Sequence, residues 1–423
     1  MKFNRRGFIR SASLLAGFTI SEIDAMATMN RTATQGRSVA SDDKKYWGDV
    51  RELFPLEKGY AYLNNGTVGP SPYPVIEAIH RGMMLTDEKG KYHHGKEVVE
   101  SLARFIGAAK EEIAITHNVT EGINIACWGV PLKRRDEVIM TTHEHVGNAL
   151  PWLNRMKQDG IVIKTFTPAD TADETLHRVK KLISSKTRVI AVPHMPCTQG
   201  QILPVKDICL IAQKDNIYTF IDGAHGPGML PVDVKDLGCD VYASCGHKWM
   251  LGPKGTGFLY VNRSFQDNLI PKYVGGGSAS WELSGEEASI ESYTDTAHRY
   301  YGGTQNTGLL DGLVATVDFL EHIGVQNIYQ RIKYLGTYAQ EQLLSIGNKV
   351  ELLTPTEKES FCGINSFVIK GIDNKKFFTE SIDKGVRIRY VPESKLNCLR
   401  VSTHIYNSTE DIDMLIEEIK KVV

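Results

Sequence analysis

The stretch YTFIDGAH, residues 218–225, and the stretch DVYASCGHK, residues 240–248, decide the fold of this 423-residue chain. Each begins with a short run rich in β-branched and aromatic residues and leads to a reactive group, the carboxylate of Asp222 or the amine of Lys248. Parallel strands present ligand-binding residues at their carboxyl ends in this way. The two stretches therefore predict neighbouring parallel strands with a ligand site at one edge of the sheet.

Asp222 and Lys248 together have the chemistry that pyridoxal 5'-phosphate requires. A lysine amine forms a Schiff base with this cofactor, and a buried carboxylate keeps the pyridine nitrogen protonated, so that the ring accepts electrons from a substrate carbanion. For either residue alone, a surface lysine or a turn aspartate is the simpler interpretation. The cofactor interpretation is favoured because several functional residues occur in a fixed order and a GPKGTG turn follows them at 252–257. These residues are Asp222, His225, Ser244, His247 and Lys248.

This segment resembles the cofactor core of aminotransferase class V, a branch of the fold-type I pyridoxal phosphate enzymes, and the resemblance runs from about Tyr60 to the C-terminus. It implies that Lys248 is the Schiff-base lysine and that Asp222 pairs with the pyridinium. It also implies that His225 lies beside the phenolic oxygen of the cofactor, and that Ser244 and His247 hold its phosphate. Isopenicillin N epimerase-type members look most similar.

Two further runs follow predicted strands. THNVTEGIN at 116–124 opens a helix, whose N-terminus suits an anion, although Thr120 could be a simple N-cap. HEHVGNALPW at 143–152 suggests a metal site, but its histidines lack the i, i+4 spacing of a helical zinc site and no third ligand is evident, so metal is the poorer interpretation. The resemblance assigns Val119 and Thr120 to the phosphate cup. It makes His145 the imidazole that stacks on the cofactor and helps to move protons, and a structural role is expected for His143.

Three more residues belong to the expected site. GGTQNT at 302–307 resembles the element with which a neighbouring subunit completes the phosphate site, so Thr304 implies a homodimer with shared active sites; a glycine-rich turn before a helix is the alternative. Arg400 lies in CLRVSTHIYNSTED at 398–411, which resembles the family's C-terminal motif with its carboxylate-binding arginine. A guanidinium suits this role because it can hold an α-carboxylate in a bidentate pair, and a surface salt bridge is the alternative. Asn65 lies in a loop that resembles the active-site entrance, where it is expected to bind substrate.

The composition disfavours several classes of protein. A chain that is 42% hydrophobic and 23% charged is long enough for a large core and more than one domain. With 49 basic and 50 acidic residues, it has no basic surplus for nucleic acid or an anionic membrane. The seven cysteines form no CxxC pair and no regular framework, which argues against structural zinc and a disulfide scaffold.

The N-terminus differs from the rest of the chain. NRRGFIR at 4–10 precedes a modest apolar run at 11–20 and the small-residue pattern AMA at 25–27, which is typical of a twin-arginine signal. A basic amphipathic segment or a short anchor is the alternative, but the apolar run is too short to span a bilayer. Residues 1–27 are therefore expected to engage the twin-arginine export machinery, and the protein is expected to be periplasmic or otherwise exported.

After a polar linker at 28–45, strands are expected to alternate with helices. The expected strands are 137–142, 161–166, 187–193, 218–222, 240–244 and 257–261. This alternation predicts an α/β fold with a mostly parallel sheet covered by helices, in a large cofactor-binding domain at 46–305. A smaller α+β domain is expected at 306–423, beginning with helices at 308–323 and 329–344.

The motifs specify cofactor chemistry more closely than substrate. Cysteine desulfurases carry a nucleophilic cysteine on a loop before the arginine, but 387–397 contains none, and Cys398 is too close to Arg400 for that task. The leading expectation is an isopenicillin N epimerase-like enzyme that acts at the α-carbon of an amino acid or amino-acyl metabolite, by epimerisation or transamination. The alternatives are a C–S lyase or cysteine desulfurase-like enzyme, a siderophore side-chain tailoring enzyme, and a non-catalytic periplasmic binding protein.

Overall fold

The computed structural model describes residues 36–90, 92, 96–285 and 287–423, together with Met29, Thr32 and Thr34. The predicted signal at 1–27 lies outside these residues. Within the predicted linker, residues 37–43 have little regular secondary structure, but the Val39 amide donates a hydrogen bond of 3.1 Å to the Asn327 side chain. Helix α3 (Lys44–Arg51) then begins two residues before the expected start of ordered structure at Tyr46.

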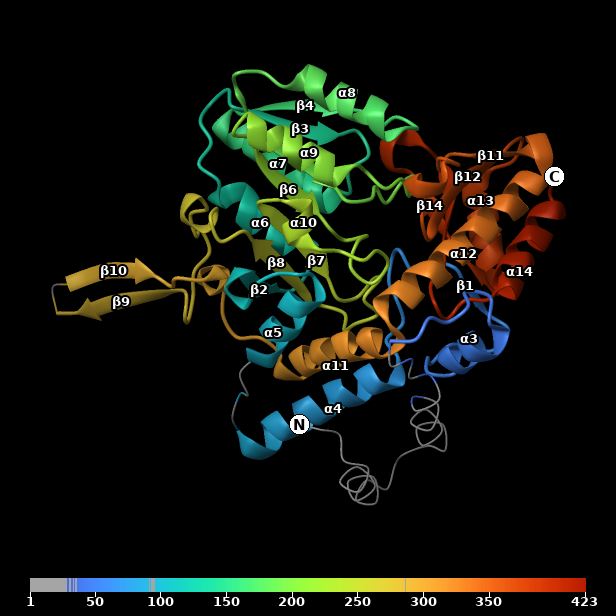
Figure 1. Cartoon of the computed structure of the whole chain (residues 1–423), viewed down its shortest axis with the longest axis horizontal. Coiled ribbons are helices and arrows are strands. Elements are labelled where there is room, and N and C mark those ends of the chain that lie inside the picture. The colour runs from blue at the N-terminus through green and yellow to red at the C-terminus, as the bar shows by residue number, and fades with distance from the viewer. Residues whose placement is uncertain are drawn as a thin grey trace.

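A seven-stranded sheet forms the centre of the large part of the molecule (Figure 1). Its order is β2 (Ile113–Thr116), β8 (Gly257–Val261), β7 (Val241–Cys245), β6 (Tyr218–Asp222), β5 (Thr187–Pro193), β3 (Glu137–Thr141) and β4 (Val162–Phe166). Strands β7, β6, β5, β3 and β4 run parallel, and β8 is antiparallel to both of its neighbours. The predicted mostly parallel α/β sheet is confirmed.

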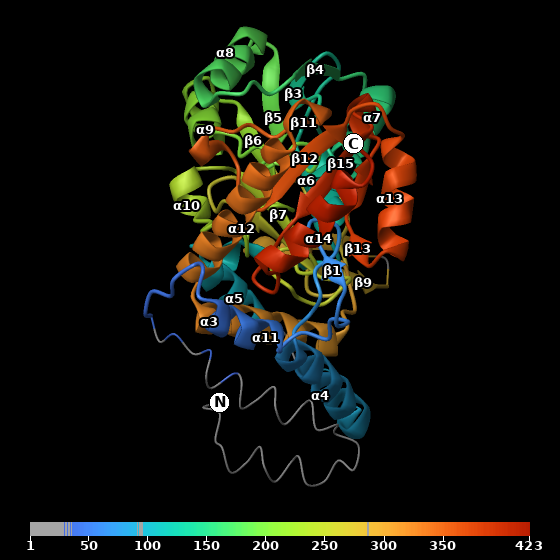
Figure 2. The same cartoon turned by 90° about the vertical axis from the view of Figure 1, so that its right-hand side faces the viewer.

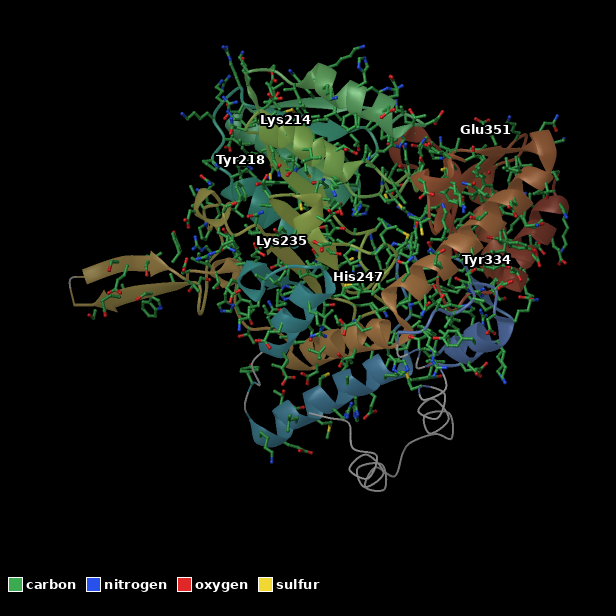
Figure 3. All side chains as sticks on the ribbon, in the orientation of Figure 1. Lys214, Tyr218, Lys235, His247, Tyr334 and Glu351 are labelled. Atoms are coloured by element: carbon green, nitrogen blue, oxygen red, sulfur yellow. The ribbon has the colours of Figure 1, made fainter. Side chains whose placement is uncertain are left out.

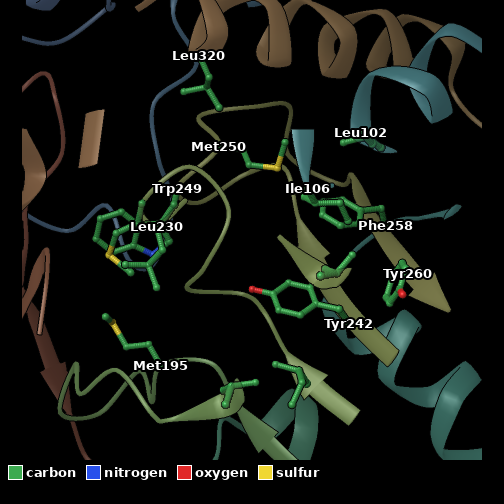
Figure 4. Packing of buried hydrophobic residues seen from close by; sticks show 14 of the residues in the cluster. Leu102, Ile106, Met195, Leu230, Tyr242, Trp249, Met250, Phe258, Tyr260 and Leu320 are labelled. Carbon is green, nitrogen blue, oxygen red and sulfur yellow. The ribbon is translucent and has the colours of Figure 1, made fainter. Parts of the chain in front are cut away.

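Helices cover both faces of this sheet. On one face, α6 (Val119–Gly129) and α7 (Val146–Asp159) share a cluster of buried side chains with Ala243 and Leu259. On the other face, a buried cluster joins Tyr242 and Phe258 to five helices, α5 (Lys96–Phe105), α8 (Ala172–Leu182), α9 (Val205–Lys214), α10 (Val234–Leu237) and α11 (Thr307–Ile323). Figure 4 shows this second cluster, with Trp249 contributed by the loop after β7. Helix α4 (Tyr73–Lys89) packs along α11 (Figure 1).

Residues 325–423 form a smaller part of the molecule, called the small part below. It contains an antiparallel sheet of four strands. Their order is β11 (Val350–Leu352), β12 (Ile364–Ile369), β15 (Cys398–Ser402) and β14 (Arg389–Val391). Three helices, α12 (Val325–Ser345), α13 (Asn374–Asp383) and α14 (Thr409–Lys420), lie toward the viewer in Figure 2. The α+β character predicted for this part is confirmed.

Two contacts bear on the division into domains. Strand β1 (Ala61–Tyr62), from the N-terminal side, pairs in parallel with β13 (Val386–Arg387) of the small part. Helix α11 instead packs on α4 and α5 of the large part. The boundary at 305/306 stays a prediction, and these contacts associate β1 with the small part and α11 with the large one.

A hairpin that the sequence did not predict projects from the body of the molecule (Figure 1). It consists of β9 (Ala279–Ser284) and β10 (Glu287–Tyr293), and Trp281 and Leu283 are 67% and 73% exposed. Short 3-10 helices occupy 110–112, 266–268, 297–300, 347–349, 358–360 and 393–395. None of the helices in the described ranges has both the length and the apolar character that a membrane span requires.

Candidate active site

The carboxyl ends of four parallel strands, β3, β5, β6 and β7, meet at one edge of the large sheet, next to the small part. Strand β2 points the same way as β7, because β8 is antiparallel to both, so the N-terminus of α6 lies at this edge too. Figure 3 shows His247 near the middle of the molecule, with Tyr334 and Glu351 in the small part. The segments that follow these strands carry most of the predicted site residues.

Lys248 lies in the turn after β7, next to His225. Its Nζ is 3.4 Å from Nε2 of His225, while the indole Nε1 of Trp249 donates a hydrogen bond of 2.9 Å to Nδ1 of the same imidazole. Burial, followed by the positive charge of Lys248, holds the pKa of His225 well below its ordinary value. His225 is therefore a neutral imidazole beside the lysine amine.

Asp222 ends β6 as a buried carboxylate that is 3% exposed. Its Oδ1 accepts a hydrogen bond of 2.9 Å from the amide of Ala224, and its backbone carbonyl accepts one of 2.8 Å from the amide of His194. The turn that follows is held tightly against β7, because a Cβ on Gly223 would lie 1.9 Å from the Tyr242 ring. The predicted pair of Asp222 and Lys248 is thus placed at the ends of neighbouring strands.

His145 caps α7, and its Nδ1 accepts a hydrogen bond of 3.1 Å from the Gly147 amide. Burial and the charge of Lys248 lower its pKa, so its imidazole is neutral near neutral pH. No hydrogen bond from the described residues occupies its Nε2. His143 is 5% exposed, and its Nδ1 lies 2.9 Å from the Thr198 hydroxyl, which agrees with a structural role. No group of three or more metal-ligating side chains occurs among the residues that the structure describes.

Glu144 lies between the two histidines, and no role was predicted for it from the sequence. Its carboxylate is enclosed, accepting hydrogen bonds of 2.9 and 2.8 Å from the amide and hydroxyl of Thr141, and one of 2.7 Å from Asn148. Burial raises the pKa of Glu144 to about 8, and the negative charge of Asp222 acts in the same direction. Glu144 therefore keeps its proton near neutral pH.

The residues predicted to form the phosphate cup lie at the N-terminus of α6. Val119 and Thr120 begin the helix, where backbone amides favour an anion. The first turn of α7 closes on it, because a Cβ on Gly147 would lie 2.5 Å from the Thr120 hydroxyl. Nδ1 of His247 is buried and has no hydrogen-bond partner among the described residues, and burial lowers the pKa of His247 to about 4.

Ser244 does not face this cup. Its hydroxyl donates a hydrogen bond of 3.0 Å to the carbonyl oxygen of Gly223. Side chains alternate along a strand, and Ala243 faces Gly122 of α6, so Cys245 shares that face and Ser244 points to the other. The structure thus corrects the phosphate role expected for Ser244, and the strand alternation, if applied to the sequence, favours Cys245.

Arg400 lies in β15 with its side chain completely buried. Its Nη1 donates a hydrogen bond of 2.8 Å to the Cys197 carbonyl, and its Nη2 donates one of 3.0 Å to the Thr67 hydroxyl and a longer one of 3.4 Å to Asn64. Its Nε has no partner, and no carboxylate forms an ion pair with it in the described part of the chain. Burial and the nearby charge of Arg389 lower its pKa to about 10, so Arg400 stays cationic and suits a ligand carboxylate.

Asn65 and Thr304 are placed differently from the other residues. The Asn65 side chain is fully buried, accepts a hydrogen bond of 3.2 Å from the Tyr406 hydroxyl and lies 3.5 Å from the Lys248 carbonyl oxygen. Asn64, rather than Asn65, contacts Arg400, and the substrate contact expected for Asn65 stays a prediction. Thr304 is exposed before α11, and no hydrogen bond links it to the other candidates in the described residues.

The loop between β14 and β15 lies against the segment before His145. Ser394 donates a hydrogen bond of 2.7 Å to the Thr142 carbonyl, and Arg389 forms an ion pair with Glu393. No cysteine occurs in this loop. Burial raises the pKa of the Cys398 thiol to about 12, which outweighs the lowering effect of Arg400, so Cys398 is a poor nucleophile.

These residues fit pyridoxal 5'-phosphate. The Lys248 amine, the buried Asp222 carboxylate and the neutral His145 imidazole supply the groups that the ring requires, and the α6 N-terminus with the orphaned His247 Nδ1 suits its phosphate. Arg400 adds a buried cation for a substrate carboxylate.

Comparison with known proteins agrees with this arrangement. The family model described as Aminotransferase class-V matches residues 76–415. The chain is 28% identical to a probable cysteine desulfurase of Pyrococcus abyssi, covering 89% of this chain and 97% of the relative, and 27% identical to isopenicillin N epimerase of Amycolatopsis lactamdurans, covering 89% and 98%. Among solved structures, an apo cysteine desulfurase from Thermococcus onnurineus NA1 matches with a TM-score of 0.80 at 25% identity, covering 92% of this chain and 99% of that one. The cystine C–S lyase C-DES, in complex with cysteine persulfide, shares the fold with a TM-score of 0.80 at 24% identity, covering 86% and 98%.

Proposed function

The chain belongs to the aminotransferase class-V family of pyridoxal phosphate enzymes, and from this premise we propose that it is a carbon–sulfur lyase, which releases sulfur from the β-carbon of a cysteine-type amino acid. This is the alternative that the sequence left open, and not the epimerase-type or transaminase-type reaction that it favoured. Names of relatives such as the Pyrococcus abyssi protein support sulfur chemistry.

Each residue of the site has a task in this proposal. Pyridoxal 5'-phosphate, when bound, supplies a ring that withdraws electrons from the α-carbon of the substrate. Arg400 holds the α-carboxylate in its planar fork and so orients the Cα–H bond. The Lys248 amine carries the proton away from the α-carbon, His145 excludes water from one face of the ring, and Asp222 keeps the ring nitrogen protonated.

The single observation that favours elimination over persulfide formation on the protein is the loop between β14 and β15. A desulfurase that stores sulfur as a persulfide on its own chain needs a reactive thiol near the substrate. Here the loop has none, and Cys398 is held as a buried thiol of raised pKa. Sulfur must then leave on the substrate fragment itself, as it does when L-cystine and water give pyruvate, ammonia and cysteine persulfide.

Epimerisation is the second candidate, because it also needs no protein thiol and because isopenicillin N epimerase matches nearly the whole chain. The two reactions differ in the fate of the substrate side chain. An epimerase returns the α-proton to an intact amino acid, whereas a lyase loses the β-substituent.

One experiment separates these reactions. The holoenzyme is incubated in deuterium oxide with L-cystine, L-cysteine, L-alanine and L-glutamate, and the products are identified by mass spectrometry. Pyruvate and ammonia formed from L-cystine support the lyase. Deuterated amino acid of inverted configuration, without pyruvate, supports the epimerase, and a stable oxo acid with aminated cofactor supports a transaminase.

We also propose a homodimer and export through the twin-arginine route. Thr304 is exposed, as a residue donated to a neighbouring active site would be in a monomer. Lys248→Ala and Thr304→Ala variants are each expected to be impaired, and mixing them is expected to restore activity by forming one intact shared site. Failure of the mixture to regain activity, when the variants exchange subunits, would contradict the shared site.

A further inference from the structure

Trp249 follows Lys248 in the chain, and both side chains contact the imidazole of His225. The two nitrogens of His225 have different neighbours: Nδ1 lies 2.9 Å from the Trp249 indole nitrogen and Nε2 lies 3.4 Å from Nζ of Lys248. An indole N–H is a donor only and has no acceptor lone pair. Nδ1 of His225 must therefore be the acceptor in its contact with Trp249.

This contact decides where the imidazole proton resides. A neutral imidazole carries one proton, and when Nδ1 accepts a hydrogen bond the proton is on Nε2. Burial and the charge of Lys248 oppose the doubly protonated form of His225. The Nε2–H then points toward Lys248, whose nitrogen accepts this hydrogen bond when it has a lone pair.

Trp249 is itself held rigidly. Its side chain is completely buried, and a Cβ on Gly363 would lie 2.9 Å from the edge of its ring. The His404 ring stacks on it with centroids 5.7 Å apart and an interplanar angle of 29°, and Nε2 of His404 donates a hydrogen bond of 2.9 Å to the Trp249 carbonyl. Because His404 lies two residues after β15, the strand that carries Arg400, Trp249 is anchored to the substrate side of the site as well.

We propose that Trp249 is a positioning residue that fixes the tautomer of His225, so that an Nε2–H donor faces Lys248 and the cofactor joined to it. The indole N–H disfavours a proton on Nδ1, because two donors would then face each other. Without the indole, the proton can move to Nδ1, and Nε2 then presents a lone pair to Lys248. A hydrogen-bond donor at this place stabilises negative charge on the cofactor atoms beside the lysine linkage. Trp249 thereby tunes the linkage without touching the substrate.

The tautomer is testable in the protein without cofactor, so this test is independent of the proposed reaction. Histidine labelled with nitrogen-15 is introduced into the full chain, and the His225 signal is assigned from its absence in a His225→Gln variant. The wild-type spectrum is expected to show a protonated Nε2 and an unprotonated Nδ1 that accepts a hydrogen bond. A proton on Nδ1 would overturn the proposal.

A second measurement tests the effect on the cofactor. The absorbance of the Lys248-bound cofactor is titrated with pH in wild type, Trp249→Phe and Trp152→Phe. Trp152 is a matched control, because it is also completely buried but its indole nitrogen has no hydrogen-bond partner in the part of the chain that the structure describes. Trp249→Phe is expected to shift the midpoint by about half a pH unit or more, because a lost donor changes the relative stability of the two protonation states, while Trp152→Phe leaves it in place.

Equal midpoints in all three proteins would contradict the proposal. Thermal unfolding of each variant shows whether it is folded at the temperature of the titration. If Trp249→Phe is not folded, the nitrogen-15 spectrum of the wild-type protein decides the question alone.

Discussion

Replacement of Arg400 by lysine is expected to weaken substrate binding while it leaves cofactor binding intact. Lysine keeps the positive charge but loses the planar fork, so that one of two parallel hydrogen bonds to the substrate carboxylate disappears. A hydrogen bond to a charged group contributes about 1.5–3 kcal/mol, which corresponds to a fall in kcat/KM of about 10- to 150-fold. Steady-state kinetics on the substrate that product analysis identifies give this ratio, and titration of cofactor into the apoprotein gives the cofactor affinity.

Arg331 provides the control for Arg400. It too is a buried arginine whose guanidinium donates to backbone carbonyls, those of Ser41 and Asn407, at 2.7 Å. Arg331→Lys is therefore expected to show a similar loss of stability without the loss in kcat/KM. A value of kcat/KM for Arg400→Lys that equals that of Arg331→Lys would refute the carboxylate role of Arg400.

Three further variants and one localisation test follow from the same structure. Asp222→Asn is expected to bind cofactor but to lower kcat by at least about tenfold, since an amide cannot keep the ring nitrogen protonated; a rate near that of wild type contradicts this role. Cys398→Ser is expected to keep activity and L-cysteine to leave no persulfide on the protein, because burial raises the pKa of that thiol to about 12, and sulfur trapped on Cys398 by mass spectrometry would restore the desulfurase hypothesis. For Glu144→Gln, the free energy of unfolding is compared with that of wild type between pH 4.5, the ordinary pKa of a glutamate, and about pH 8; wild type is expected to lose stability relative to the variant over this range, because the unfolded carboxyl releases its proton there and the folded one does not. An equal difference between the two proteins at both ends of the range would contradict the raised pKa. Replacing Arg5 and Arg6 by lysine is expected to retain the precursor in the cytoplasm, and normal delivery would remove the case for twin-arginine export.

Much of the sheet and the centre of the site could be predicted because their signal is local. Each strand of the large sheet is a short apolar run, and a strand end places the next side chain at the sheet edge whatever lies around it. This is why Asp222, His225 and Lys248 come together as expected. Register within a strand is a finer property, and the error at Ser244 arose there, since a shift of one residue reverses the face of a side chain.

Other parts depend on contacts between distant segments. Asn65 is drawn to Tyr406 and to the Lys248 backbone by the packing of β1 against the small part, and no local pattern near Asn65 signals that packing. The hairpin of β9 and β10 follows a glycine-rich stretch, and its apolar side chains Trp281 and Leu283 stay exposed. Its strands therefore lack the pattern of buried apolar residues by which strands are predicted. The raised pKa of Glu144 likewise comes from enclosure that only the folded chain provides.

The stoichiometry of products from L-cystine tests the central claim most directly. Purified holoenzyme is given L-cystine, and pyruvate and cysteine persulfide are quantified together, with Lys248→Ala as the control. Equal amounts of the two products are expected from the wild-type enzyme, with neither product from the Lys248→Ala variant and no sulfur bound to the protein. Turnover by Lys248→Ala, or consumption of L-cystine without pyruvate, would contradict a lyase that works through this lysine.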